Sequence, residues 1–156
     1  MVEIVENRFE ANIILCEKIE GENSLKGIFN NIEIDQGDTT TFGMWIFLVA
    51  DIKECKKETF LLDVIYKSNK EEDSIPINFL GSLEKTYECS GVNRELIVLK
   101  ENVIEFKWEG MYTLEMRHCK KSVNINEASY EEMTEIINDS TVINSFTFSV
   151  EFEKDM

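Results

Sequence analysis

Histidine is the side chain that most often acts as a general base, and this chain of 156 residues contains one, His118. It follows Tyr112, Leu114 and Met116 at two-residue spacing, so we expect it on the apolar face of a strand, satisfied by a neighbouring group. Cys119 would point to the opposite face, and the sequence contains no G-x-S-x-G motif. A serine or cysteine nucleophile paired with this histidine is therefore not indicated.

Four cysteines are the other candidate metal ligands: Cys16, Cys55, Cys89 and Cys119. They lie 39, 34 and 30 residues apart without a C-x-x-C pair, so they match neither a zinc ribbon nor a thioredoxin-like site. Zinc bound by His118 with Cys16, Cys55 or Cys89 stays open as an alternative, because strands can gather distant residues. We expect buried or half-buried thiols, no metal and no disulfide.

The 31 acidic residues are too numerous for one pair of carboxylates to be singled out as a general acid and base. The loop at residues 35–38, Asp-Gln-Gly-Asp, offers oxygen ligands but lacks the distal glutamate of a calcium-binding EF-hand, so we interpret it as a turn. Glycine motifs for phosphate or dinucleotide binding and the H-E-x-x-H motif do not occur. The sequence indicates no catalytic residue and no cofactor.

Acidic residues outnumber basic residues by 31 to 16, which gives a formal net charge of −15. This charge repels nucleic-acid phosphates and anionic lipid headgroups, so we expect neither direct nucleic-acid binding nor membrane binding. With 43% hydrophobic residues the chain is too apolar to be disordered, and its length suits a single domain over residues 1–156.

The first twenty residues contain Glu3, Glu6 and Glu10 and lack the basic start and long apolar run of a signal peptide. The longest apolar run, residues 44–50, is too short to cross a bilayer. We therefore expect a cytoplasmic protein.

Alternation of apolar and polar side chains predicts a mainly β fold. The alternation is clearest at 112–118 and 146–152, and segments rich in β-branched or aromatic residues predict further strands at 11–19, 25–34, 42–52, 59–67, 75–83 and 95–100. Pro76 marks a strand start or an edge. Seven or eight strands joined by short turns favour a sandwich or barrel, and we predict an antiparallel β-sandwich.

One short helix is expected near the C-terminus, within an insertion at residues 127–139. Ser129 and Glu132 have the spacing of a capping box. An apolar stripe then follows at helical spacing, formed by Tyr130, Met133, Ile136 and Ile137. We expect the stripe to cover an open end or edge of the sheets, and contact with a partner is the alternative.

The segment 42–52 is apolar on both faces, which is typical of a central strand. Ile46 and Leu48 lie on one face, and Trp45 and Phe47 lie on the other. If no other part of the chain covers the second face, Trp45 and Phe47 form an exposed patch of the kind that marks association surfaces. Burial within the chain and contact with a partner or a second copy both stay open.

Three segments resemble a group of small uncharacterised bacterial β-sandwich proteins: A-N-I-I-L-C at 11–16, S-L-K-G-I-F-N-N-I at 24–32 and G-M-Y at 110–112. The resemblance extends from about residue 10 to 152, implies a β-sandwich and assigns no chemistry, and the helix is an addition to its pattern. Gly27 would permit a bulge or the close approach of a neighbouring side chain. Tyr112 would tie the preceding turn to nearby backbone.

A complete set of strands without a catalytic motif predicts a non-catalytic protein-interaction or accessory module that binds a protein partner or a second copy. The candidate surface residues are Trp45, Phe47, Tyr130, Met133 and Ile137. One alternative is a β-sandwich that binds a small molecule near aromatic residues such as Trp108 and Tyr112. Another is an acidic mimic of nucleic acid that inhibits a nucleic-acid-binding protein.

Overall fold

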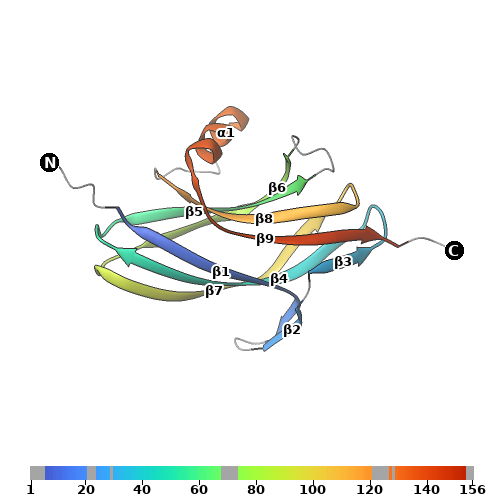
Figure 1. Cartoon of the computed structure of the whole chain (residues 1–156), viewed down its shortest axis with the longest axis horizontal. Helices are drawn as coiled ribbons and strands as arrows, with labels where there is room; N and C mark the ends of the chain where they lie inside the picture. The colour runs from blue at the N-terminus through green and yellow to red at the C-terminus, as the bar shows by residue number, and fades with distance from the viewer. Residues whose placement is uncertain are drawn as a thin grey trace.

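The computed structural model of the chain describes residues 6–20, 24–28, 30–67, 74–120, 127 and 129–153. Nine strands and one helix lie within these ranges (Figure 1). In chain order they are β1 (Arg8–Glu20), β2 (Ser24–Ile28), β3 (Asn31–Ile34), β4 (Thr39–Ile52), β5 (Lys57–Lys67), β6 (Ser74–Thr86), β7 (Gly91–Glu105), β8 (Gly110–Cys119), α1 (Tyr130–Asp139) and β9 (Thr141–Phe152).

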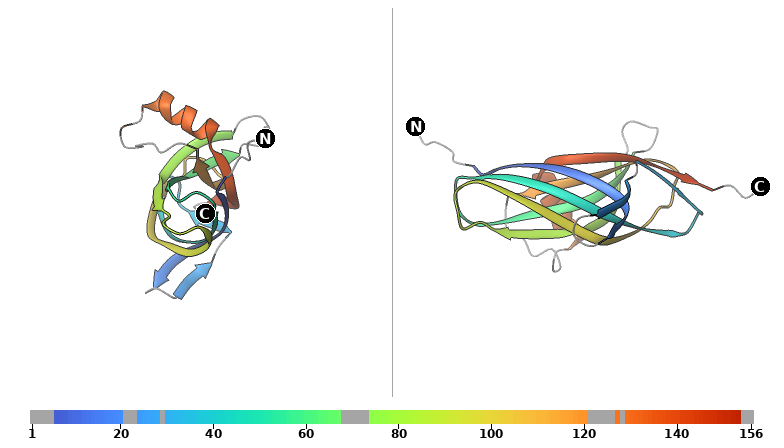
Figure 2. Two further views of the ribbon diagram at one scale, coloured as in Figure 1. Left: turned by 90° about the vertical axis from the view of Figure 1, so that its left-hand side faces the viewer. Right: turned by 90° about the horizontal axis from the view of Figure 1, so that it is seen from below.

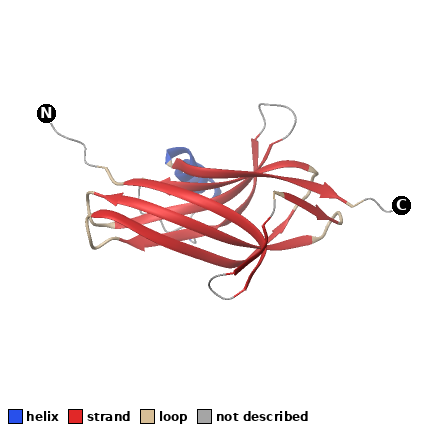
Figure 3. Cartoon of the chain, turned by 60° about the horizontal axis from the view of Figure 1, so that its bottom comes forward, coloured by secondary structure: helices blue, strands red, loops and turns tan. Residues whose placement is uncertain are grey.

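The strands form two sheets that pack face to face (Figure 2). Sheet A has the order β2-β1-β4-β7 and is antiparallel throughout. Sheet B has the order β3-β9-β8-β5-β6 and is antiparallel except for the parallel pair of β3 and β9. Strands make up most of the described chain, with α1 as an addition (Figure 3). The prediction of a mainly β sandwich with one short helix is confirmed.

Two strand predictions need correction. Segment 25–34 is not one strand, because β2 pairs with β1 in sheet A whereas β3 pairs with β9 in sheet B. Alternation of apolar and polar residues does not indicate which sheet a strand joins. The passage of the chain from sheet A to sheet B within this segment could therefore not be predicted from the sequence. The strand predicted at 95–100 is too short, because the observed strand β7 is longer at both ends. Those ends carry few buried apolar residues, so the sequence pattern did not indicate them. Residues 21–23 and 68–73 lie outside the described residues.

Gly27 lies in β2 with φ at +67°, a left-handed conformation that favours glycine. A Cβ atom at this position would lie 2.7 Å from the carboxyl group of Glu17 on the neighbouring strand β1. The predicted close approach of a neighbouring side chain is therefore confirmed.

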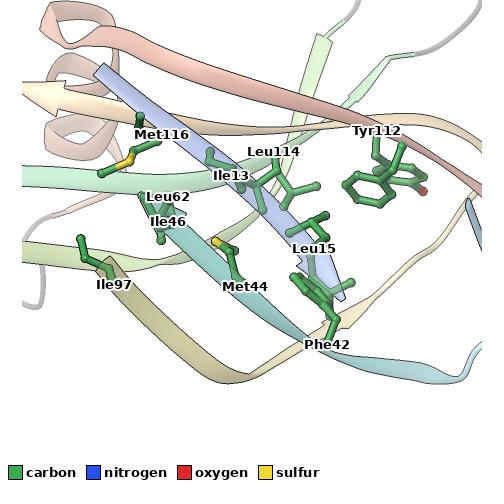
Figure 4. Packing of buried hydrophobic residues seen from close by; sticks show 14 of the residues in the cluster. Ile13, Leu15, Phe42, Met44, Ile46, Leu62, Ile97, Tyr112, Leu114 and Met116 are labelled. Carbon is green, nitrogen blue, oxygen red and sulfur yellow. The ribbon is translucent and has the colours of Figure 1, made fainter. Parts of the chain in front are cut away.

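The core lies between the sheets, where side chains from the inner faces interdigitate (Figure 4). Leu15, Met44 and Ile46 of sheet A pack in one buried cluster with Leu62 and Leu114 of sheet B. Strand β4 lies between β1 and β7, as expected for a central strand, and its inward-facing side chains belong to this cluster.

Tyr112 fixes the turn that precedes β8. Its hydroxyl donates a hydrogen bond to the carbonyl oxygen of Trp108 at 2.5 Å, and its ring is fully buried beside Phe106 and Phe148. Burial raises the pKa of the phenol to about 12, so the hydroxyl remains a donor at neutral pH. The predicted tie between Tyr112 and nearby backbone is confirmed.

Helix α1 begins as predicted, because the Ser129 hydroxyl accepts the backbone N–H of Glu132 at 3.2 Å. The last turn of the helix carries no basic residue. A positive charge is instead provided there by Arg117 of β8, whose guanidinium donates a hydrogen bond to the carbonyl oxygen of Ile137 at 3.3 Å. The helix thus lies against the outer face of a central strand of sheet B (Figure 2). The expectation that it covers an open end or edge is wrong.

Helix α1 has ten residues. Within the described residues no helix is both long and apolar enough to span a membrane.

Candidate functional site

The outer face of sheet A is the candidate site, and strand register builds it. Each outward side chain of β4 has one neighbour on β1 and one on β7. Three successive cross-strand rows result: Ile14, Trp45 and Val98; Asn12, Phe47 and Leu96; Glu10, Val49 and Arg94. We call the six apolar members of these rows the apolar face: Ile14, Trp45, Val98, Phe47, Leu96 and Val49.

The apolar face is open to solvent. Ile14 is 37% exposed, Phe47 is 43% exposed and Leu96 is 46% exposed, and the other three members are half-buried. An antiparallel sheet with one face on the core normally presents polar side chains on the other face. Adjacent apolar residues on a solvated sheet face are instead typical of an interaction surface.

Trp45 is half-buried on this face, between Ile14 and Val98. Its indole nitrogen is buried and has no hydrogen-bond partner in the described part of the structure. Because that donor is covered by neighbouring atoms, Trp45 contributes apolar ring surface and no polar contact to whatever binds there.

Two charged residues border the apolar face. Glu10 and Arg94 lie on opposite sides of Val49, one on β1 and one on β7, and both are exposed. Neither makes an ion pair within the ranges that the structure describes. The next row contains Arg8, Asp51 and Val92, and Asp51 pairs with Lys53 at 3.4 Å. Among the described residues, the border of the face therefore carries one charge of each sign, on two different strands, without an ion pair.

The structure does not bring the five predicted surface residues together. Trp45 and Phe47 are neighbours on the outer face of sheet A, as predicted. Met133 and Ile137 are half-buried on α1, which lies against sheet B. The side chain of Tyr130 lies outside the described residues. The helix therefore neither covers nor extends the apolar face.

Sequence reasoning missed Ile14, Leu96 and Val98. A signal existed, because the runs 13–15 and 96–99 are apolar on both faces of a strand, just like 42–52. What the sequence lacks is the register that aligns these residues with Trp45 and Phe47.

His118 forms a polar centre at one end of the sandwich. Its Nε2 hydrogen-bonds Oε2 of Glu58, and its ring packs against Phe9 and Phe60 with centroids 4.5 and 5.6 Å apart. Glu58 is 4% exposed and also accepts a hydrogen bond from the Asn7 amide at 3.1 Å. The prediction of a histidine satisfied by a neighbour is confirmed.

An open groove of about 600 Å³ lies beside His118, between the start of β1 and the start of β9. Its walls mix acidic and basic side chains: Glu6, Arg8, Glu10, Lys56 and Lys120. At its floor, Glu58 is already engaged by Asn7, Lys56 and His118. The mixed charges of the walls therefore favour neither an anionic nor a cationic ligand, and the Glu58 carboxylate at the floor already contacts groups of this chain.

Another polar cluster lies on the outer face of sheet B. Asp63 of β5 and Glu115 of β8 are buried in register, and one guanidinium, that of Arg117, lies 3.6 Å and 3.0 Å from their respective carboxylate oxygens. Burial and the neighbouring Glu115 charge raise the pKa of Asp63 to about 6, although Arg117 opposes the shift. Because Arg117 also binds the end of α1, this cluster anchors the helix.

The other sequence-predicted positions carry no site. Tyr112 is fully buried and Trp108 stacks on Tyr66 at 5.1 Å, so a ligand site lined by Trp108 and Tyr112 is not formed. Asp38 donates its backbone N–H to the carbonyl of Asp35 at 3.1 Å, as the predicted turn requires. Among the described residues no cluster of three or more histidine, cysteine or acidic side chains could hold a metal ion.

None of the four cysteines forms a disulfide. Cys16 and Cys119 are buried, whereas Cys55 and Cys89 are exposed, so the expectation that all four are at least half-buried is wrong for these two, which lie in loops between strands. Burial raises the pKa of the Cys119 thiol to about 11, which keeps it protonated and unreactive at neutral pH.

Comparison with known proteins gives no family. No protein-family model and no curated protein matches the sequence. Among solved structures the chain is similar to a hemolymph type prophenoloxidase (proPOb) from a crustacean, with a TM-score of 0.48 and 6% identity. The similarity covers 94% of this chain and 34% of that chain, so this chain spans about a third of its length. The likeness carries no argument about function, and the resemblance to bacterial β-sandwich proteins stays a prediction.

Proposed function

We propose that the chain is a non-catalytic protein-interaction module that docks through the apolar face of sheet A. The observation that carries the proposal is the exposure of three apolar side chains on neighbouring strands: Phe47 and Leu96 lie in one row, and Ile14 lies in the adjacent row. Helix α1 lies against sheet B and does not cover this face. A protein partner would remove these side chains from water.

The energetic gain from docking is substantial. At about 25 cal/mol per Å² of apolar surface, burying the exposed parts of three large side chains contributes on the order of 1–2 kcal/mol each. Half-buried Trp45, Val49 and Val98 lie between and beside them, so the contact would be continuous. A central apolar patch with a charged border is the usual anatomy of a protein interface.

The proposal places the module in the cytoplasm. The absence of disulfides among four cysteines, two of them exposed, supports a reducing compartment. The net charge of −15 favours a protein over a nucleic acid or an anionic membrane as the partner.

The test uses the matched substitutions Phe47→Glu and Val142→Glu. The two side chains are 43% and 42% exposed, but Val142 lies on β9 of sheet B. In extracts of cells that express the tagged chain, we expect size-exclusion chromatography to place the wild type and V142E above the chain mass of 18.2 kDa. We expect F47E to elute at that mass. A wild-type chain that elutes as a monomer in extracts would overturn the proposal.

A further inference from the structure

We propose that the occupant of the apolar face is a second copy of this chain, packed face to face about a twofold axis parallel to β4. The inference rests on the proposed function and specifies its partner. A twofold contact requires a surface that is complementary to itself, and the rows of sheet A meet this requirement.

The register determines which residues would meet. A twofold axis that runs along β4 places β4 on its own copy and exchanges the two flanks, so β1 faces the partner's β7. Phe47 then meets its own copy at the axis, and Ile14 meets the partner's Val98. These contacts are apolar and join half-buried or exposed side chains, whereas Asn12 of the Phe47 row meets the partner's Leu96.

The charges complete the match. Glu10 and Arg94 share one row, on opposite sides of Val49. The same axis brings Glu10 opposite the partner's Arg94, and by symmetry this pair occurs twice. Each side chain lacks an ion pair within the described part of its own chain. Complementary charges at the border of an interface fix its register and suppress wrong arrangements.

The alternative axis, perpendicular to the strands and through the Phe47 row, gives a poorer match. It would place β1 on β1 and β7 on β7, so that Glu10 meets the partner's Ile14 and Arg94 meets the partner's Val98. Both charges would then be desolvated against apolar side chains without a counter-ion, which is costly.

One row beyond Glu10 and Arg94, Asp51 would approach its own copy in the favoured arrangement, and exposed Arg8 would face the partner's Val92 at the margin of the contact. Lys53 compensates this charge within the chain at 3.4 Å. Packed sheets also cross at roughly −30°, so the strands of the two copies diverge away from the centre of contact. The like charges at Asp51 are therefore separated and compensated.

The decisive experiment is a charge exchange within one chain. The variants are Glu10→Arg, Arg94→Glu and the double variant E10R/R94E. The control for changed net charge is Glu33→Arg, at an exposed position of β3 in sheet B. Sedimentation equilibrium of the purified proteins measures the dissociation constant of the dimer. The two exchanged positions and the control position are all exposed, so the variants are expected to fold.

We expect the wild type and E33R to form dimers of similar affinity and each single variant to dissociate on the order of tenfold more readily, because like charges then meet twice. We expect E10R/R94E to recover the wild-type dissociation constant within about threefold, since the pairs are restored in reverse. A double variant as weak as the single variants would overturn the twofold arrangement, and so would a purified wild-type chain that stays monomeric.

These failures are separable from failure of the proposed function. A monomeric purified chain whose complex in cell extracts is still lost in F47E would refute the second copy and retain the docking surface. A complex in extracts that is unaffected by F47E would refute both.

Discussion

Asp63 is a buried carboxyl group with a raised pKa. It is 3% exposed, neighbours the Glu115 carboxylate in register and shares the single guanidinium of Arg117. A carboxyl group with a raised pKa binds its proton more tightly in the folded chain than in the unfolded chain. Its ionisation therefore destabilises the fold as the pH rises.

We expect Asp63→Asn to change the pH dependence of stability. With the pKa of Asp63 raised from 3.8 to about 6, the wild type loses stability between pH 4 and pH 7 relative to D63N, by about 3 kcal/mol. Below about pH 3 the carboxyl group is protonated in both states, and the difference no longer changes with pH. Urea unfolding at successive pH values measures this. Parallel profiles for the two proteins would show that Asp63 does not titrate with a raised pKa.

Tyr112 illustrates a residue whose polar end matters as much as its ring. Tyr112→Phe removes the donor to the Trp108 carbonyl but keeps the buried ring, and we expect a loss of about 1–2 kcal/mol in the free energy of unfolding. Tyr66→Phe is the matched control, because it removes a 2.9 Å bond to the Glu109 carbonyl in an exposed setting. An equal loss in both variants would contradict the role of burial.

Some residue roles could be predicted from the sequence because they depend on local spacing. The tie of Tyr112 to its turn and the satisfied state of His118 both follow from position along one strand. The partner of His118 could not be predicted, because Glu58 lies on β5, sixty positions earlier. The same holds for Asp63 and Glu115, which only strand pairing brings together.

At the scale of elements, α1 is attached to the sandwich without belonging to its core. No helix residue whose side chain is described, 131–139, is a member of the main buried cluster. Ser129 caps the start of the helix, and Arg117 of β8 binds its end. Local opening of the helix should therefore leave the sheets intact.

We expect Ser129→Ala to destabilise α1 alone. Loss of the cap costs about 1 kcal/mol, which corresponds to roughly fivefold faster amide exchange of Glu132 and Met133. Amides of β8 in the same sample provide the internal control and should not change. Faster exchange in β8 as well would mean that helix and sheet open together.

Element types were predictable and element partners were not. Alternation located nearly every strand, and the capping box located the start of α1. The division of segment 25–34 between two sheets and the placement of α1 on a sheet face depend on contacts between segments far apart in the chain. Periodicity carries no information about such contacts.

At the scale of the whole molecule, the two outer sheet faces differ in chemistry. The outer face of sheet B buries Asp63 and Glu115 and carries α1, whereas the outer face of sheet A exposes apolar side chains. The sequence predicted the apolar second face of β4 but left open whether the chain covers it. The two flanking strands that enlarge the apolar face emerged only from the register.

The most direct test of the apolar face as a docking surface is site-specific photo-cross-linking in living cells. A photoreactive amino acid replaces Leu96, which is 46% exposed on sheet A, or in a separate protein Met111, which is 45% exposed on sheet B. We expect one discrete cross-linked protein species from position 96 and none from position 111. Equal cross-linking at both positions, or none at position 96, would contradict the central claim.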